Sequence, residues 1–434
     1  MEKTISQFHF TLILCLATRP LTTQAANKLL LVLLDGFRYD LYGNNLSSFA
    51  EIAKRGVRAN YAKPVFPSFS SPCMYSIATG LWVESHGVVH NSYYNASTGE
   101  TYDFFQTQNI TEWWDTGAEP VWVTGKLQGL TAGSYAYPGG SVPVKGILPD
   151  KVVYSTLRLY LTNLNERIDT VIGWIADDDI DITFLYYNLL DDVMHVVGQP
   201  SPAGDSIIAD KILSDINDDI HHLLEKLEER DLFDKVNVLY TADHGHVEVE
   251  GQIKLFDYIS EDDLDFYLFS DAAFTQLLPK EGKLEQVYQA LDGAHPHMHV
   301  YKKEEMPEHL HYSNNERILP LVVIADPPFQ LMTADRSIKS SEHGYDYMNQ
   351  EMWTMFYAHG PSFKKGYEAK GFQSVDIYPL MCEILDIKPA PNNGSLDNVK
   401  DMILDTAVGS AVYTKPSTWF PLVFILQVAR YRKI

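Results

Sequence analysis

The stretch KLLLVLLDGF, residues 28–37, decides the fold class. Six consecutive apolar residues, 29–34, end at the acid Asp35. A strand that is apolar on both sides must be covered on both faces, as in a parallel sheet layered between helices. Asp35 then lies at the carboxyl edge of the sheet, where open α/β sheets bind their ligands.

Three further apolar runs predict strands of the same sheet: residues 120–124, 181–187 and 235–241. Residues 210–230 carry apolar side chains at helical spacing, which predicts a helix between the last two strands. This alternation predicts an α/β domain with a central, mainly parallel sheet and helices on both faces. Because the sequence shows no internal repeat and no low-complexity linker, we expect one domain over residues 27–404.

Both ends of the chain carry features of a different kind. Residues 1–26 combine a basic start, a short apolar run and small residues near their end, which predicts a secretory signal peptide. The alternative of a buried first helix is disfavoured by Arg19 and Pro20 directly after the apolar run. In the expected tail, residues 405–434, the apolar run 419–429 is shorter than the roughly 20 residues that span a bilayer. A shortened membrane anchor, an interfacial tail and a processed end are the alternatives for this tail.

Acidic residues outnumber basic ones. The 434 residues include 57 Asp and Glu against 34 Lys and Arg, for a net charge of −23, while 45% of residues are apolar. The composition therefore predicts a large core and an acidic surface that repels phosphate backbones, which excludes nucleic acid as a partner. Four glycosylation sequons fit a secreted or cell-surface protein outside the cell. Their asparagines are Asn45, Asn95, Asn109 and Asn393.

The 3 cysteines are too few for a multi-bridge scaffold. Cys15 belongs to the predicted signal peptide, which leaves Cys73 and Cys382. One bridge between these two and a pair of buried free thiols are both compatible with the sequence.

Acidic and imidazole side chains follow the ends of the predicted strands. Because parallel strands share one carboxyl edge, we expect these side chains to meet there. Carboxylate and imidazole ligands suit Zn²⁺, and two such ions about 3.5–4 Å apart promote phosphoryl displacement. Each residue alone also fits a helix cap or a buried core histidine, so the joint arrangement carries the prediction. The candidates are Asp35, Asp191, His195, Asp243, His244 and, in a separate segment, His343.

The segment FPSFSSPCMYSIATG, residues 66–80, offers a nucleophile. Ser71 and Pro72 predict the N-cap and first turn of a helix. Ser70 lies just ahead, where free N–H groups and the helix dipole favour an alkoxide and a phosphate oxygen. An adjacent Zn²⁺ would lower the pKa of its hydroxyl further. Ser68 lies in the extended approach, and the alternative is that all three serines only form the turn and the cap.

Several motifs in a fixed order resemble one enzyme family. They are LLDGFR (33–38), FPSFSSP (66–72), ATGLWVESHGVVHN (78–91), DHG (243–245) and EHGYD (342–346). In this order they resemble the ectonucleotide pyrophosphatase/phosphodiesterase family of the alkaline phosphatase superfamily, over nearly the whole mature chain. The resemblance implies an alkaline-phosphatase-like fold and a phosphoric diester hydrolase.

The resemblance also implies two Zn²⁺ ions per chain. One ion would be held by Asp35, Ser70, Asp243 and His244, and the other by Asp191, His195 and His343. Ser70 takes the register of the family's nucleophile, so the implied reaction forms and then hydrolyses a phosphoryl-Ser70 intermediate. Asn91 matches an asparagine that donates to a phosphate oxygen.

Within the family, the likeness is strongest to its choline phosphodiesterases. This implies a choline phospholipid substrate at a membrane or micelle surface, with sphingomyelin cleaved to ceramide and phosphocholine. Tyr137 and Phe266 fall at the positions of aromatic residues that cage the choline, whose quaternary ammonium binds to ring faces. A nucleotide or glycerophosphodiester phosphodiesterase is the alternative in the same reaction class.

Three residues depart from the usual family pattern. Leu190 and Met194 stand where a Pro and a Gly are usual, and His246 replaces a Met. The ligands themselves are intact, so we expect metal binding. The departures nevertheless support a second alternative, a catalytically degenerate protein that only binds its ligand.

Overall fold

The structure is a computed structural model that describes residues 27–41, 46–95, 97–154, 156, 162–268, 271–333 and 338–404. The expected signal peptide, the expected tail and Asn45 lie outside these residues. The compact unit that holds the described elements ends at Ile403. None of the helices in the described residues is both long and apolar enough to cross a membrane.

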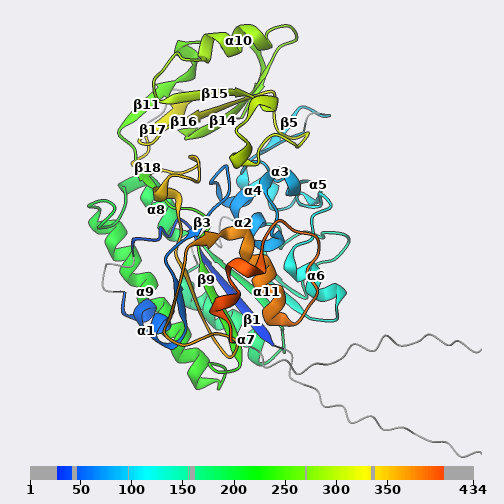
Figure 1. The fold of residues 1–434 in the computed structure, drawn as a ribbon, viewed down its shortest axis with the longest axis vertical. Helices are drawn as coiled ribbons and strands as arrows, with labels where there is room; N and C mark the ends of the chain where they lie inside the picture. Colours follow the sequence, from blue (N-terminus) through cyan, green and yellow to red (C-terminus); the bar gives the residue numbers. More distant parts are fainter. Residues whose placement is uncertain are drawn as a thin grey trace, which may run out of the picture. The chain divides into compact units, whose positions relative to one another are not determined.

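An eight-stranded sheet forms the centre of the larger lobe (Figure 1). In spatial order its strands are β20 (Tyr367–Ala369), β2 (Val57–Ala59), β19 (Phe356–His359), β9 (Val236–Thr241), β1 (Lys28–Leu34), β8 (Ile182–Tyr187), β6 (Ala132–Tyr135) and β7 (Lys151–Val153). Only β19 runs antiparallel to its neighbours, which confirms the predicted mainly parallel sheet. The stretch that opens the domain is its central strand, and residues 29–34 are completely buried.

Helices cover both faces of this sheet, as predicted. One group packs together around the longest helix, and it comprises α1 (Ser47–Arg55), α7 (Leu164–Ala176), α8 (Leu189–Val197) and α9 (Ile207–Glu229). The second group comprises α2 (Ser70–Thr79), α6 (Val121–Leu127) and α11 (Ile377–Leu385). The α9 helix buries one apolar stripe and begins at a capping Ser206, whose side chain accepts from Ala209 N.

The predicted strand at residues 120–124 is wrong, because these residues begin α6. Pro120 precedes the first helical turn, where its fixed φ is compatible with helix initiation. Residues 121–125 are all buried, so the short run shows no helical periodicity that would distinguish it from a buried strand. The strand in this part of the sheet is β6 instead.

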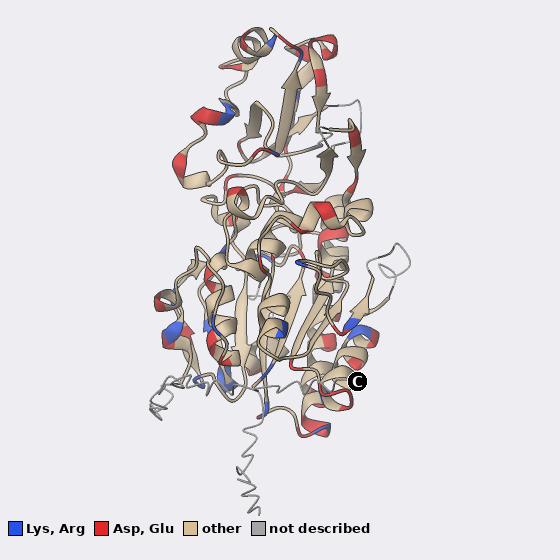
Figure 2. Ribbon diagram, turned by 90° about the vertical axis from the view of Figure 1, so that its right-hand side faces the viewer, with Lys and Arg blue, Asp and Glu red and all other residues tan. Residues whose placement is uncertain are grey.

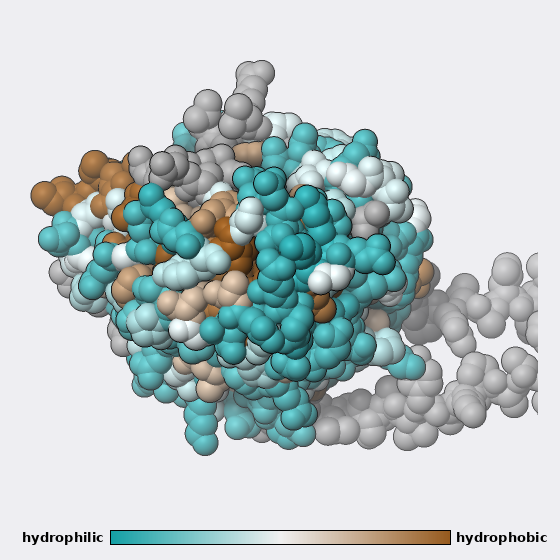
Figure 3. Space-filling view, turned by 90° about the horizontal axis from the view of Figure 1, so that it is seen from above, coloured by the Kyte–Doolittle hydropathy of each residue, from teal (hydrophilic) through white to brown (hydrophobic). Residues whose placement is uncertain are grey.

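A smaller lobe has an apolar core of its own. It contains an antiparallel sheet of β12 (Leu264–Tyr267), β14 (Phe274–Pro279), β16 (Leu321–Ala325) and β15 (Met298–Lys302), covered by α10 (Leu284–Leu291). A second sheet joins β11 (Gly251–Lys254), β17 (Phe329–Met332) and β13 (Asp271–Ala272). Acidic positions are distributed over both lobes (Figure 2), and most of the face in Figure 3 is hydrophilic, in keeping with the net charge.

Short elements complete the described fold. The paired strands are β3 (Ala62–Lys63) with β21 (Phe372–Gln373), β4 (Tyr93–Asn95) with β5 (Glu100–Tyr102), and β10 (Val247–Glu248) with β18 (Ser341–Glu342). The short helices are α3 (Val83–His86), α4 (Phe104–Thr107) and α5 (Thr111–Trp114). Cys73 and Cys382 are both buried free thiols, so no bridge joins them.

Candidate active site

Asp35, Asp243 and His244 form one candidate metal cluster, called here the Asp35 cluster. Asp35 follows β1 and the other two residues follow β9, and these are adjacent parallel strands. His244 Nε2 lies 3.5 Å from Asp35 Oδ1 and 3.3 Å from Asp243 Oδ2. One ligand atom of each residue lies within 4.8 Å of the other two, so the three side chains can hold one ion.

Unpaired oxygens in the Asp35 cluster indicate a cation. Asp35 Oδ1 and Asp243 Oδ2 are buried and have no hydrogen-bond partner among the described residues. The other oxygen of each is paired, since Tyr186 donates to Asp35 Oδ2 at 2.5 Å and Gly36 N to Asp243 Oδ1 at 3.2 Å. Burial, followed by the charge of Asp243, raises the pKa of Asp35 well above its ordinary value. A Zn²⁺ ion at the two unpaired oxygens would offset this repulsion, so the donor set fits the metal.

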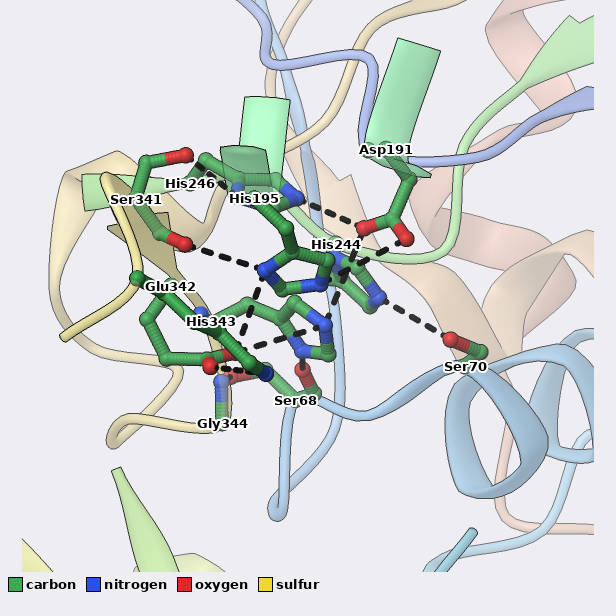
Figure 4. Close-up of polar contacts among 12 residues, drawn as sticks. Ser68, Ser70, Asp191, His195, His244, His246, Ser341, Glu342, His343 and Gly344 are labelled. Atoms are coloured by element: carbon green, nitrogen blue, oxygen red, sulfur yellow. Dashed lines mark hydrogen bonds and ion pairs between the residues drawn. The ribbon is translucent and has the colours of Figure 1, made fainter. Parts of the chain in front are cut away.

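Asp191, His195 and His343 form a second group, called here the Asp191 cluster (Figure 4). Asp191 and His195 lie one turn apart on α8 and therefore share a face. His195 Nε2 lies 3.5 Å from Asp191 Oδ2, and His343 Nε2 lies 3.7 Å from Asp191 Oδ1. His343 directly follows β18, and its ring stacks on that of His244 with a centroid separation of 3.6 Å. The two clusters are therefore adjacent.

Backbone carbonyls orient the histidines of both clusters. His195 Nδ1 lies 2.9 Å from Ser341 O, His343 Nδ1 lies 2.9 Å from Ser68 O, and His244 Nδ1 lies 3.3 Å from Gly245 O. A carbonyl only accepts, so each Nδ1 carries the hydrogen and each Nε2 keeps its lone pair. Burial also lowers the pKa of His343 well below its ordinary value, which favours the neutral imidazole that binds metals.

Ser70 is the first residue of α2 and borders the Asp35 cluster. Its Oγ lies 3.3 Å from His244 Nε2 (Figure 4). At this end of the helix, the peptide N–H groups and the dipole favour negative charge on an attacking oxygen or a phosphate. Ser70 therefore lies where a nucleophile could act, and its role as the nucleophile stays a prediction.

The two neighbouring serines have other roles. Ser68 Oγ donates to Tyr345 O at 2.8 Å and accepts from Gly344 N at 3.2 Å, so it holds the loop that carries His343. Ser71 was expected to cap α2, but the N-cap is Phe69 and the Ser71 hydroxyl has no hydrogen-bond partner within the described chain. The helix begins earlier than predicted because a proline is tolerated anywhere in the first turn, where N–H groups lack helical partners.

A cavity of about 430 Å³ opens over both clusters. Its lining includes Asp35, Ser70, Asp191, His195 and His343, together with the aromatic residues Phe69, Phe104, Phe105 and Tyr186 and the charged residues Asp192, Lys339 and Glu342. Asn91 also lines this cavity, and its Oδ1 accepts from Ser71 N at 2.8 Å. Because Oδ1 is used in this bond, the side chain offers its Nδ2 hydrogens to a ligand.

Two aromatic residues that were expected to hold choline lie elsewhere. The Tyr137 side chain is fully buried, its hydroxyl donates to Met74 O at 2.7 Å, and its ring packs against Phe184. Phe266 stacks on Tyr94 with a centroid separation of 3.8 Å and lines a separate cavity. Neither residue lines the cavity over the clusters, so the aromatic side chains available there are different ones.

Three buried or cavity-lining residues border the clusters and were not predicted as site residues. His246 Nε2 lies 2.7 Å from Asp191 Oδ1, Glu342 Oε1 lies 3.6 Å from His343 Nε2, and Tyr186 donates to Asp35. His246 and Glu342 could have been suspected, because each lies within two residues of a predicted histidine ligand. Nothing in the sequence distinguishes Tyr186 as a site residue, because its segment shows only the apolar pattern of a buried strand.

The sequon asparagines differ in their surroundings. Asn109 and Asn393 are exposed, and Asn95 is half-buried. The Asn393 side-chain oxygen accepts from Trp82 N at 3.0 Å, which holds the chain near Gly80. The surfaces around Asn109 and Asn393 are accessible to a glycosylating enzyme, and glycosylation stays a prediction.

Comparison with known proteins identifies the family. The family model described as type I phosphodiesterase / nucleotide pyrophosphatase matches residues 29–346. Human ectonucleotide pyrophosphatase/phosphodiesterase family member 7 is 37% identical over 402 residues, which cover 89% of this chain and 86% of the relative. Human bis(5'-adenosyl)-triphosphatase ENPP4 is 35% identical, with coverage of 87% and 82%.

A solved structure gives the same answer for the fold. The inactive murine family member 5 in complex with AMP superposes with a TM-score of 0.81 at 33% identity, covering 87% of this chain and 100% of that chain. The comparisons confirm the predicted alkaline-phosphatase-like architecture. The chain belongs to the ectonucleotide pyrophosphatase/phosphodiesterase family and is a phosphoric diester hydrolase.

Proposed function

We propose that this protein hydrolyses choline phospholipids, sphingomyelin to ceramide and phosphocholine above all, with two Zn²⁺ ions and a phosphoryl-Ser70 intermediate. The observation that carries the chemistry is the pair of buried, unpaired oxygens on Asp35 and Asp243, next to a serine at a helix N-terminus. When bound, the metal would polarise the phosphoryl group and lower the pKa of the serine hydroxyl.

The chain's own residues position the reacting groups. Ser70 Oγ attacks the phosphorus, the bond to the ceramide oxygen breaks, and that oxygen leaves as the alcohol after taking up a proton. Water then attacks the phosphorus, which releases phosphocholine and restores the serine. Asn91 Nδ2 and the positive end of the α2 dipole stabilise the phosphate oxygens during both steps, while Ser71 N holds Asn91 in place through its Oδ1.

The charge of the cavity supports a cationic head group. Beyond the clusters the lining carries Asp192 and Glu342 against a single lysine, and Lys339 Nζ already pairs with Glu342 Oε2 at 2.5 Å. The aromatic residues Phe104 and Phe105 lie in the same lining. A trimethylammonium group bound against ring faces within a net negative wall is stabilised electrostatically, whereas a second phosphate is repelled.

A nucleotide phosphodiesterase is the second candidate, because similarity to relatives of that kind is almost as strong. The murine relative binds AMP, and ENPP4 is named for hydrolysis of bis(5'-adenosyl) triphosphate. The rings of Phe104 and Phe105 would then stack on a base instead of holding choline.

Activity assays separate these candidates. Purified protein is compared on sphingomyelin in mixed micelles, glycerophosphocholine and a nucleotide phosphodiester. We expect the choline lipid to have the highest kcat/KM. A higher value on the nucleotide diester would favour the second candidate, and no hydrolysis of any of the three with bound zinc would favour a degenerate binding protein.

Two serine variants test the nucleophile. Ser70→Ala removes the attacking oxygen and should reduce kcat by at least about 10³-fold, because covalent catalysis is lost. Ser71→Ala is the matched control, since the Ser71 hydroxyl makes no hydrogen bond within the described residues and the variant should keep most of the activity. Equal activity of the parent and Ser70→Ala would refute the mechanism.

We also propose that the protein acts outside the cell, either secreted or at the cell surface, on lipid in a membrane or micelle. The predicted signal peptide and the exposed sequons at Asn109 and Asn393 support this location. Retention of the protein after expression with residues 1–26, rather than its export to the medium or cell surface, would contradict it.

A further inference from the structure

We infer that His246 is an additional protein ligand of the metal at the Asp191 cluster, so that three imidazoles and one carboxylate surround that ion. The inference rests on the proposed metal site and goes beyond it, because His246 is a departure of this chain from the usual family pattern. Its position, its hydrogen bonding and its relation to the other histidines support this role independently.

The His246 ring is fixed beside the Asp191 carboxylate. The residue is completely buried in the connection between β9 and β10, and its Nε2 lies 2.7 Å from Asp191 Oδ1. Gly36 lies directly against the ring, since a Cβ on this glycine would come within 3.1 Å of His246 Cδ2 and Nε2. The ring therefore has little freedom to turn away from the cluster.

Hydrogen bonding allows a cation to replace the hydrogen on Nε2 of His246. In the metal-free protein Nε2 donates this hydrogen to Asp191 Oδ1 at 2.7 Å. The Ser341 hydroxyl donates its single hydrogen to Met194 O at 2.9 Å, so its oxygen, 3.1 Å from His246 Nδ1, can accept a hydrogen from that nitrogen. A cation bound between Nε2 and Oδ1 would therefore leave the neutral ring with its hydrogen on Nδ1, where an acceptor is in place.

The same pattern occurs at the predicted histidine ligands. In His195, His244 and His343, Nδ1 also lies beside an oxygen acceptor and Nε2 is directed at a carboxylate. His246 is thus prepared in the way that metal-binding histidines are, with the tautomer set by the partner of the second nitrogen.

The three histidines around Asp191 also form a triangle of suitable size (Figure 4). The ring centroids of His195, His246 and His343 are separated by 4.9, 5.1 and 5.1 Å. Imidazoles bound tetrahedrally to one Zn²⁺ have centroids roughly 5 Å apart, as follows from Zn–N bonds of about 2.0–2.1 Å. One ligand atom each of Asp191, His246, His343 and the neighbouring His244 lie within 4.8 Å of one another, so His246 belongs to a group that can hold a metal.

A fourth fixed protein ligand would distinguish this ion from the one at Asp35, whose fourth protein ligand would be the reacting Ser70. Four protein ligands are typical of tightly held zinc, whereas an ion with three keeps a position for water or substrate. We therefore expect the ion at Asp191 to be the more tightly held of the two and the more resistant to chelators.

Zinc affinity of the full-length secreted protein tests the inference. The parent, His246→Gln and His246→Met are titrated against a competing chromogenic chelator. His222→Gln is the histidine control, because His222 is a half-buried residue of α9 that pairs with Asp169 away from the clusters. We expect two ions in the parent, with the affinity of one site reduced more than about 100-fold in both His246 variants. This exceeds the roughly 10–100-fold effect of removing a group that only hydrogen-bonds to a ligand. The other site and His222→Gln should match the parent.

Glutamine separates a ligand from a hydrogen-bond donor, because its amide can still donate to Asp191. Parent affinity in His246→Gln would overturn the inference and leave His246 as a positioning residue. If His246→Met does not fold, Co²⁺ in place of zinc gives a second readout, because the visible spectrum of bound Co²⁺ depends on its ligands. Identical Co²⁺ spectra for the parent and His246→Gln would also overturn the inference that His246 is a ligand. A parent that binds no zinc at all would instead refute the proposed function.

Discussion

Exchanging one carboxylate of the Asp35 cluster should have opposite effects on stability with and without metal. In Asp243→Asn, the side-chain oxygen can still accept from Gly36 N and His244 N, which lie 3.2 and 3.0 Å from Asp243 Oδ1. The new amide replaces Asp243 Oδ2, the atom without a hydrogen-bond partner among the described residues, and faces the unpaired Asp35 Oδ1. Repulsion is therefore exchanged for a hydrogen bond at little steric cost.

The size of the effect follows from the geometry. The ligand oxygens of Asp35 and Asp243 lie within 4.8 Å of each other. Two unit charges at that distance repel by about 3 kcal/mol at an effective dielectric constant of about 20. In metal-free protein at a pH above the raised pKa of Asp35, where both carboxylates are charged, Asp243→Asn should raise the free energy of unfolding by about that amount. The melting temperature should rise by about 4 °C, given an unfolding entropy of roughly 2 cal/mol/K per residue.

Zinc should reverse the order of the two proteins. A metal that binds only the folded state stabilises it by about 4 kcal/mol at a concentration of 1,000 times its Kd, which exceeds the metal-free advantage of the variant. The parent gains this term, whereas Asp243→Asn, with one anionic ligand fewer, gains only a small part of it. Thermal unfolding followed by circular dichroism, first in chelator and then in excess zinc, measures both effects.

The pH dependence of the metal-free protein gives a further check. Burial and the neighbouring acidic charges raise the pKa of Asp35, and burial raises that of Asp243. A raised carboxyl pKa contributes stability that is complete below the ordinary pKa and is lost as the pH rises through the raised value. The stability advantage of Asp243→Asn should therefore shrink as the pH falls.

A second buried carboxylate provides the matched control. Both oxygens of Asp376 are hydrogen-bonded, Oδ1 to Ser395 N at 2.7 Å and Oδ2 to Asn398 Nδ2 at 2.9 Å. Asp376→Asn should destabilise the protein equally with and without zinc. If Asp243→Asn also lowers the melting temperature in chelator, the two carboxylates do not repel each other and the argument for a cation at this cluster fails.

Three other perturbations have defined outcomes. Burial, and then the charge of Asp215, raises the pKa of Asp219 to about 6. Asp219→Asn should therefore stabilise the protein at pH 8 by about 1 kcal/mol, after allowance for solvent screening. This gain in stability should vanish below about pH 4, and a gain that does not change with pH would contradict the prediction. Burial raises the pKa of the Cys73 thiol and that of the Cys382 thiol, the latter to about 12. A thiol reagent at pH 8 should therefore label both cysteines only after the protein is unfolded. If labelling of the unfolded protein also requires a reductant, the two cysteines form a disulfide. Asn91→Ala should lower kcat/KM by about 10²-fold at unchanged zinc content, as expected for loss of one donor to the phosphate, and unchanged kinetics would remove Asn91 from the site.

The three strands at the centre of the sheet could be predicted because the signal for each lies within its own segment. The strands β1, β8 and β9 are apolar runs bounded by polar residues, and α9 shows a clear helical period. The sequence does not distinguish the α6 helix from a strand, because its short, fully buried apolar run shows no helical periodicity. In the same way, the sequence places Ser70 near a helix start but does not reveal which serine begins the helix.

The sequence by itself determined the fold class and the acidic and imidazole residues that follow β1, β8 and β9, because strand periodicity and chain order are local properties. Only the tertiary structure decided the direction of individual side chains: Tyr137 is buried in the core, Phe266 lines another cavity, and His246 lies against Asp191. These choices depend on packing between segments up to a hundred or more residues apart, such as Ser341 against Met194 and His246. Side chains of one chemical type can fill either a core or a site, and the neighbours that decide between them are brought together only by folding.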